Sequence, residues 1–208
     1  MVRFILIRHG QTDYNKLHLF QGQFDSKLTE LGFAQAELAA KRVAAEYHVD
    51  AIYSSDLSRA ANTAKAVARA VGLDNVTTDP AFREVDVGRW MHQKVSEAFK
   101  SDPKLAQEQS EHPGRFRYPD GETLLEVYER AMAGIEKIAK DSDGKTVVIV
   151  SHGGTIRSLI KIWLGYDIDE SKGVPSMGNT AISVFDYADG KFTPILIGDN
   201  SHLPDDMK

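Results

Sequence analysis

The amino-acid sequence predicts an α/β fold: a three-layer sandwich with a mostly parallel central sheet and helices on both of its faces. Two observations lead to this prediction. Short apolar runs alternate with helical patterns from residue 2 to residue 164. The run at 146–150 is β-branched throughout, which is typical of a strand that is buried on both faces. A hairpin pattern close to the C-terminus adds an antiparallel edge to this sheet.

Strands and helices alternate through the first eighty residues. Apolar runs at 2–7 and 51–54 predict two strands, and residues 75–78 are expected to form a third. Apolar positions spaced three and four residues apart predict one helix after Thr29 and another that begins near Leu57. The buried faces are expected to be Leu31, Ala34 and Leu38 on the first helix, and Leu57, Ala60, Ala64, Val67 and Val71 on the second.

The second half of the chain begins with an irregular stretch. Residues 80–120 contain four prolines and no clear helical or strand period, so we expect a lid or substrate-binding segment. The helix after it opens with a capping box formed by Thr123 and Glu126, and its expected buried face is Leu125, Tyr128, Met132, Ile135 and Ala139. The remaining predicted elements are a strand at 146–150, a helix at 155–164, a hairpin of 181–187 and 192–197, and a polar tail at 199–208 that is expected to fray.

The composition is that of an ordinary globular protein. The 208 residues are 42% hydrophobic and 26% charged, and we expect a single domain over residues 1–208. No apolar run approaches the roughly 20 residues that cross a bilayer, and no signal-peptide pattern is present, so we expect a cytoplasmic protein with no membrane partner. Cysteine is absent, which excludes disulfides and cysteine nucleophiles. The net charge of −5 argues against a nucleic-acid partner.

Charged and polar residues follow the predicted strands at the points where the strands end. Arg8 and His9 come after the first strand, Arg59 after the second, Glu84 after the third, and His152 after the β-branched strand. Ligands of open parallel sheets bind beyond the carboxyl ends of the strands, so we expect these side chains to meet at one edge. Together with two helix N-termini they predict an anion pocket that holds a candidate nucleophile and a candidate acid.

Each of these residues also has an ordinary structural interpretation. A single histidine is more often a surface or structural residue, an arginine can simply close a strand, and one glutamate among many carboxylates carries little meaning. Their joint placement at strand ends favours a phosphate site. His92, which is close to Glu84 and Trp90 in the sequence, is left open between a substrate contact and a surface residue. The other histidines are expected at the surface: His18, His48, His112 and His202.

Taken together, these polar segments resemble the histidine phosphatase superfamily, whose founding branch is the cofactor-dependent phosphoglycerate mutases. The signature tripeptide is Arg8-His9-Gly10 at the end of the first strand. The tripeptide alone is weak, but the match continues in order through essentially the whole chain. Its further segments are Thr12 and Asn15, Ser54-Ser55-Asp56-Leu57-Ser58-Arg59-Ala60 with Thr63 and Ala64, Arg83-Glu84 with Gly88 and Trp90, Asp120-Gly121-Glu122-Thr123, Ser151-His152-Gly153-Gly154, and Asn179-Thr180.

The resemblance implies a role for each residue of the pocket. His9 would be the nucleophile that becomes phosphohistidine, and Glu84 would be the proton donor and acceptor. Arg8, Arg59 and His152 would form the charged phosphate pocket. Further contacts to the phosphate or to the rest of the substrate would come from Asn15, Gln21, Gly22 and Gly153.

General chemistry agrees with these roles. A neutral imidazole is a good nucleophile, and a phosphohistidine divides hydrolysis into two easier displacements. The two arginines and a protonated His152 would stabilise the charge on the transferring phosphoryl group. Glu84 would protonate the leaving alkoxide and then activate water. The sequence contains no metal-ligand pattern, so we expect a metal-independent enzyme without a cofactor.

Hydrolysis is favoured over phosphoryl transfer. Mutases of this family carry Lys and paired Arg for the second charged end of phosphoglycerate, and residues 85–120 lack that pattern, although the roles of Arg115 and Arg117 stay open. A phosphoglycerate mutase is the alternative, and an inactive phosphoester-binding relative is a further one. The expected partner is a small phosphorylated metabolite, and the chain is expected to be a monomer or a homodimer. Four aromatic residues of this segment are expected to pack as its core, with contact to an apolar substrate as the alternative: Trp90, Phe99, Phe116 and Tyr118.

Overall fold

A six-stranded sheet in the order β3-β2-β4-β1-β5-β6 forms the centre of the computed structural model, which describes residues 1–170 and 172–208. Neighbouring strands are parallel from β3 to β1, whereas β5 is antiparallel to β1 and to β6. The predicted parallel sheet and late hairpin are thus confirmed, although the third strand is only two residues long. The strands are β1 (Val2–Arg8), β2 (Ala51–Ser54), β3 (Thr77–Thr78), β4 (Thr146–Ser151), β5 (Ile182–Ala188) and β6 (Lys191–Asp199).

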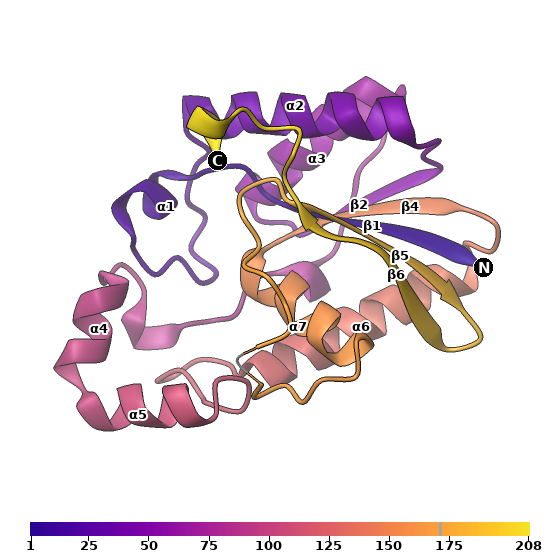
Figure 1. Cartoon of the computed structure of the whole chain (residues 1–208). Coiled ribbons are helices and arrows are strands. Elements are labelled where there is room, and N and C mark those ends of the chain that lie inside the picture. Colours follow the sequence, from indigo (N-terminus) through magenta and orange to yellow (C-terminus); the bar gives the residue numbers. More distant parts are fainter. Residues whose placement is uncertain (171) are drawn as a thin grey trace.

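Helices cover both faces of this sheet, which confirms the three-layer sandwich (Figure 1). α2 (Glu30–Glu46) and α3 (Ser58–Val71) lie on one face, and α6 (Leu124–Lys140) and α7 (Gly153–Trp163) lie on the other. In the described part of the chain, none of the helices is long and apolar enough to cross a membrane. The shorter elements are α1 (Asp13–Leu17), α4 (Val95–Ser101), α5 (Pro103–Glu111), and the 3-10 turns Pro80–Phe82, Gly88–Trp90 and Asp205–Met207.

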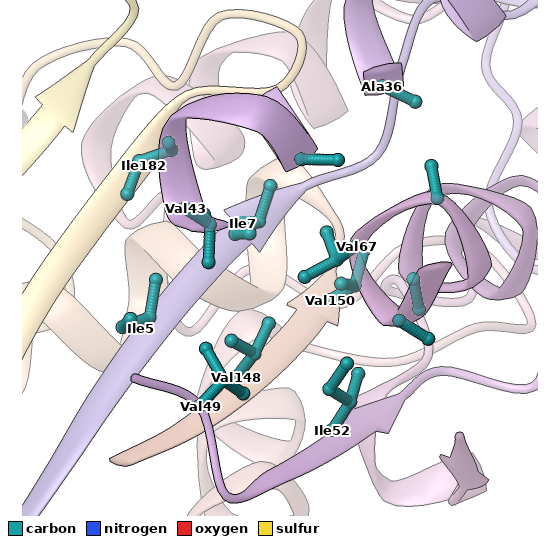
Figure 2. Packing of buried hydrophobic residues seen from close by; sticks show 14 of the residues in the cluster. Ile5, Ile7, Ala36, Val43, Val49, Ile52, Val67, Val148, Val150 and Ile182 are labelled. Atoms are coloured by element: carbon teal, nitrogen blue, oxygen red, sulfur yellow. The ribbon is translucent and has the colours of Figure 1, made fainter. Parts of the chain in front are cut away.

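The two central strands, β1 and β4, divide their side chains between two hydrophobic cores. Successive side chains of a strand point to opposite faces, so a strand with helices on both sides must be apolar throughout. Each fully buried aliphatic side chain contributes roughly 1.5–3 kcal/mol, which makes this pair a rigid base for the residues that follow it. Ile5, Ile7, Val148 and Val150 pack towards α2 and α3 (Figure 2), and Phe4, Leu6, Val147 and Ile149 pack towards α6 and α7.

α2 buries a different face from the predicted one. α6 buries most of its predicted face, since Ile135 is in the core and Tyr128, Met132 and Ala139 pack against it, together with small residues. On α2, Ala34 is exposed, and Leu31 and Leu38 are only half-buried. On α6, a Cβ at Gly134 would lie 3.1 Å from the Phe82 ring, so the helix turns this small residue inward. The fully buried residues are Gly32, Gln35, Ala36, Ala39, Ala40 and Val43 on α2, and Val127, Ala131, Gly134, Ile135 and Ile138 on α6.

Residues 80–120 contain more regular structure than the sequence predicts. α4 and α5 have 7 and 9 residues, and α5 has no fully buried residue, so neither helix leaves a clear apolar period. The aromatic core expected for this segment is confirmed. The Trp90 ring lies 5.0, 5.7 and 5.6 Å from the rings of Phe99, Phe116 and Tyr118. We call residues 80–120 the lid segment from here on.

The C-terminal tail does not fray as expected but packs back on the protein. Leu203 is buried, and Gln35 Nε2 donates a hydrogen bond to the Met207 carbonyl at 2.7 Å. His202 is half-buried beside Thr180, so its predicted surface position is wrong, and burial lowers its pKa to about 4. The remaining histidines of the surface prediction, His18, His48 and His112, are exposed as expected.

Candidate active site

Two histidines lie side by side because two neighbouring parallel strands end in register. Arg8 at the end of β1 is paired with Ser151 at the end of β4, so the next residue of each strand is a histidine. The backbone N–H of His9 donates to the Ser151 carbonyl at 3.0 Å, and the ring centroids of His9 and His152 are 5.1 Å apart. The carboxyl edge of the sheet therefore places both imidazoles in one pocket.

The His9 ring is held in one tautomer by the turn that follows it. Its Nδ1 lies 2.7 Å from the Gly10 carbonyl oxygen, which can only accept, so Nδ1 carries the proton and Nε2 keeps a lone pair. Position 10 must be glycine, since a Cβ there would lie 2.2 Å from the Gly32 carbonyl oxygen at the start of α2. Burial, followed by the charges of Arg59 and Arg8, lowers the pKa of His9 well below its ordinary value. Both effects favour the neutral imidazole.

His152 presents a donor to the same pocket. Arg59 Nε donates to its Nδ1 at 3.2 Å, so the proton of the neutral ring is on Nε2. That buried Nε2 has no hydrogen-bond partner among the described residues. Burial and the charge of Arg59 also lower the pKa of His152 well below its ordinary value. The lowered pKa favours a neutral ring that is an N–H donor, and the protonated His152 expected beside a phosphoryl group stays a prediction.

Two arginines of the cavity wall give the pocket its positive charge, with Arg59 buried and Arg8 half-buried. Burial lowers the pKa of Arg8, and it lowers the pKa of Arg59 to about 10, because neither cation is fully neutralised nearby. Arg59 Nη1 and Nη2 donate to the carbonyls of Phe24 and Gly22 at 2.7 and 2.8 Å, which fixes that loop at the cavity wall. Arg8 Nη1 donates to the Met177 carbonyl, and its buried Nε has no partner in the described part of the chain. Both guanidinium groups can bind a phosphoryl oxygen.

The carboxylate of Glu84 lies at the N-terminus of α7. Its oxygens accept from the backbone N–H groups of Gly154 and Thr155 at 3.1 and 3.2 Å, and from its neighbour Val85 at 3.0 Å. A Cβ at Gly154 would lie 2.5 Å from Glu84 Oε1, so only glycine leaves room for the carboxylate. Helix N-terminal N–H groups suit an anion, and here they hold the Glu84 carboxylate in the wall of the cavity that His9 also lines.

Sequence reasoning missed the residues that hold Glu84. Arg130 on α6 donates to the carbonyls of Ala81, Arg83 and Glu84 at 2.8–2.9 Å, which fixes the loop that carries the carboxylate. The sequence indicates that a helix begins near Gly154, but it does not indicate that the Gly154 N–H binds the Glu84 carboxylate. An arginine in the middle of a helix leaves no comparable signal in the sequence.

A cavity of about 600 Å³ opens onto these groups. The predicted residues in its wall are Arg8, His9, Gln21, Gly22, Arg59, Glu84 and Gly153, with His152 fully buried beside His9. Asn15 lies outside the described wall, because its side chain caps α1 by accepting from Thr12. His92 is exposed and pairs with Tyr14, and Arg117 is exposed and pairs with Glu126. Arg115 pairs with Asp167 and Asp169, so it ties the lid segment to the loop after α7.

The two buried histidines give the fold a specific dependence on pH. Their folded-state pKa values lie below the unfolded value of about 6.5, so the unfolded chain binds more protons below that pH. The free energy of unfolding is therefore expected to fall as the pH drops from 7 to 5, by at most about 1.4 kcal/mol per pH unit for each histidine. Urea midpoints at pH 7, 6 and 5 measure this loss. The His9→Asn/His152→Asn double variant is expected to lose less over this range, and an equal loss in both proteins would contradict the assignment of buried neutral rings.

Comparisons with known proteins agree with this geometry. The family model of the histidine phosphatase superfamily (branch 1) matches residues 4–200. The chain is 34% identical to phosphoglycerate mutase-like protein 4 of Arabidopsis thaliana over 201 residues, which covers 96% of this chain and 86% of that protein. It is 35% identical to phosphoserine phosphatase 1 of Hydrogenobacter thermophilus over 170 residues, covering 82% of this chain and 80% of that protein.

A solved structure of similar shape is the mycobacterial glucosyl-3-phosphoglycerate phosphatase in complex with VO3. Its TM-score is 0.84 at 29% identity, and the match covers 94% of this chain and 98% of that chain. The family match, the curated relatives and the shared fold all extend over nearly the whole sequence. On these grounds, the chain belongs to branch 1 of the histidine phosphatase superfamily.

Proposed function

We propose that His9 carries the phosphoryl group in the reaction of this phosphomonoester hydrolase. The single observation that supports this role best is the state of its ring. His9 is buried and neutral, and its Nδ1 proton is bound to the Gly10 carbonyl, which leaves the Nε2 lone pair at a cavity wall. The named functions of two relatives, a phosphoserine phosphatase and a glucosyl-3-phosphoglycerate phosphatase, support hydrolysis as the reaction class.

In the first displacement, His9 Nε2 attacks phosphorus and the ester P–O bond breaks. Arg8, Arg59 and the Nε2–H of His152 donate to the non-bridging oxygens, where negative charge is concentrated in the transition state. The leaving alkoxide takes its proton from Glu84, which must be protonated at this point. The products of this step are the free alcohol and a phosphohistidine.

In the second displacement, water attacks the phosphohistidine and the P–N bond breaks. Glu84 now takes a proton from the attacking water, so one carboxyl group serves as acid and then as base. Inorganic phosphate leaves, and His9 returns to its neutral state with Nδ1 still bound to Gly10. The hydrogen bonds from Gly154 and Thr155 keep the carboxylate in one place through both steps.

The substrate that this site suits is a small phosphorylated metabolite. A cavity of about 600 Å³ is in the usual range for small-molecule ligands. Apolar lid residues such as Val85, Val87 and Tyr118 share the wall with the charged groups. The carbon skeleton of the substrate would contact this apolar part, while the phosphoryl group lies against Arg8 and Arg59.

Product analysis tests hydrolysis against phosphoryl transfer. With 3-phosphoglycerate as substrate and EDTA present, we expect release of glycerate and inorganic phosphate, and inhibition by vanadate, which mimics the phosphoryl group. Glycerate should form without any bisphosphorylated primer. Dominant interconversion of 2- and 3-phosphoglycerate that requires such a primer would identify the chain as a mutase, and activity that returns only with added metal would contradict the proposed charge stabilisation by arginines.

A further inference from the structure

A second cluster of positive charge lines the same cavity, on the helix that begins at the phosphoryl site. Arg157 and Lys161 lie one turn apart on α7, and both belong to the cavity wall together with Ser158. With a rise of about 1.5 Å per residue, they lie roughly 6 and 12 Å along the helix from Gly153, where α7 starts. Both residues share the cavity wall with Arg8 and His9, and Lys161 Nζ is held at the Ile168 carbonyl in the loop after α7.

The charge of Lys161 is buried and only partly compensated. The residue is 5% exposed, and its Nζ donates to the Ile168 carbonyl at 2.7 Å. An ammonium group has three N–H donors, and a neutral carbonyl does not cancel its charge. Burial first, and then the charge of Arg157, lowers the pKa of Lys161. The carboxylates of Asp169, Asp167 and Glu170 oppose this lowering of the pKa, and the two aspartates are also paired with Arg115.

We infer that Arg157 and Lys161 bind a second anionic group of the substrate, so that the preferred substrates are short phosphomonoesters with a carboxylate or a second phosphate a few bonds from the ester. This inference rests on the proposed function, because the phosphoryl end must lie at His9. The spacing supports it: an anion within one to two helical turns of Gly153 is in reach of both cations. Residues 85–120 lack the Lys and paired Arg of the mutases, and these two cations of the cavity wall lie on α7 instead.

Matched pairs of substrates test the inference on the unmodified protein. 3-Phosphoglycerate and glycerol 3-phosphate differ only in a carboxylate against a hydroxymethyl group. Propane-1,3-diol bisphosphate and its monophosphate test a second phosphate in the same way. We expect the anionic member of at least one pair to be preferred by about ten-fold or more in kcat/KM, since charge-assisted hydrogen bonds are the strong ones. The preferred pair identifies the anion, and no preference in either pair would overturn the inference.

Variants then connect the preference to the two cations. Arg157→Gln and Lys161→Gln are each expected to lower kcat/KM for the preferred anionic substrate by about 10–100-fold, mainly by raising KM. For glycerol 3-phosphate and p-nitrophenyl phosphate, kcat/KM is expected to change by no more than about threefold. Arg157→Lys and Lys161→Arg keep the charge and are expected to retain most of the preference. Arg117→Gln removes an exposed arginine outside the cavity wall and serves as the control.

The outcomes separate this inference from the proposed function. If the unmodified protein does not hydrolyse p-nitrophenyl phosphate, the proposed function itself is wrong. If it hydrolyses that ester and prefers anionic substrates, but the preference survives in both Gln variants, another part of the cavity binds the anion and the assignment to α7 is wrong.

Discussion

Replacing His9 by Asn is expected to reduce turnover of every phosphomonoester by at least about 10³-fold, because the variant lacks the nucleophile and water must attack directly. The loss should appear equally in alkyl and aryl esters, since both require the P–N bond. Steady-state kinetics with p-nitrophenyl phosphate and an alkyl phosphate measure both losses.

The same variant keeps the groups that bind the anion. Arg8, Arg59 and His152 remain, so phosphate and vanadate are expected to raise the thermal unfolding midpoint of both His9→Asn and the unmodified protein. His48→Gln, at an exposed histidine, is the matched control and should be fully active. A His9→Asn variant that folds, binds phosphate and retains more than about a tenth of the activity would exclude His9 as the nucleophile.

Replacing Glu84 by Gln is expected to slow cleavage of alkyl phosphates by about 10²–10⁴-fold, the usual contribution of a positioned general acid. The first step with p-nitrophenyl phosphate should be affected much less, because its leaving group departs without a proton. Hydrolysis of the phosphoenzyme still lacks its base in this variant. The aryl ester should therefore give a burst of nitrophenol followed by slow turnover, which single-turnover measurements resolve.

The hydrogen bonds around Glu84 make it necessary to check that the glutamine of Glu84→Gln keeps the position of the carboxylate. Both carboxylate oxygens accept from backbone N–H groups, Oε2 from Gly154 and Oε1 from Thr155 and Val85. A glutamine offers one acceptor oxygen, so its NH₂ group would face an N–H donor and the side chain could shift. Vanadate affinity reports such a shift. Equal loss with the alkyl and the aryl ester in the first step, with weakened vanadate binding, would show that Glu84 shapes the pocket instead of transferring a proton.

The sequence predicts the meeting of His9 and His152 because it follows from one geometric rule. Parallel strands expose their carboxyl ends at the same edge, and Arg8 and Ser151 are in register, so a histidine after each strand must lie in the same pocket. Arg59 follows for the same reason, since it lies in the first turn of the helix after β2. Residues that come directly after strands are therefore predictable from pattern alone.

Residues placed by tertiary packing are not predictable in this way. The sequence indicates Glu84 as a candidate residue. Its position at the N-terminus of α7 depends on how the lid segment packs against Gly154, which the sequence pattern does not predict. Arg157 and Lys161 are two basic residues in the middle of a helix, and such residues normally face water. They line a cavity only because the lid segment and the loop after α7 enclose that side of the helix.

The protonation state of His152 is also not predictable from the sequence pattern. From the sequence, a histidine in a phosphate pocket is expected to be charged. Once the ring is fully buried between Arg59 and His9, desolvation and the neighbouring positive charge favour the neutral form. Burial is a property of the whole fold, so the pattern of residues around His152 could not supply it.

Rapid-quench labelling tests the central role of His9 most directly. The protein is mixed with ³²P-labelled p-nitrophenyl phosphate, quenched in base within the first turnover, and digested for peptide mapping. We expect a phosphoryl group that is stable in base and labile in acid, on the peptide that contains His9, at a stoichiometry that rises in Glu84→Gln because breakdown is slowed. Label on the peptide that contains His152, or turnover with no labelled peptide in either protein, would contradict the account.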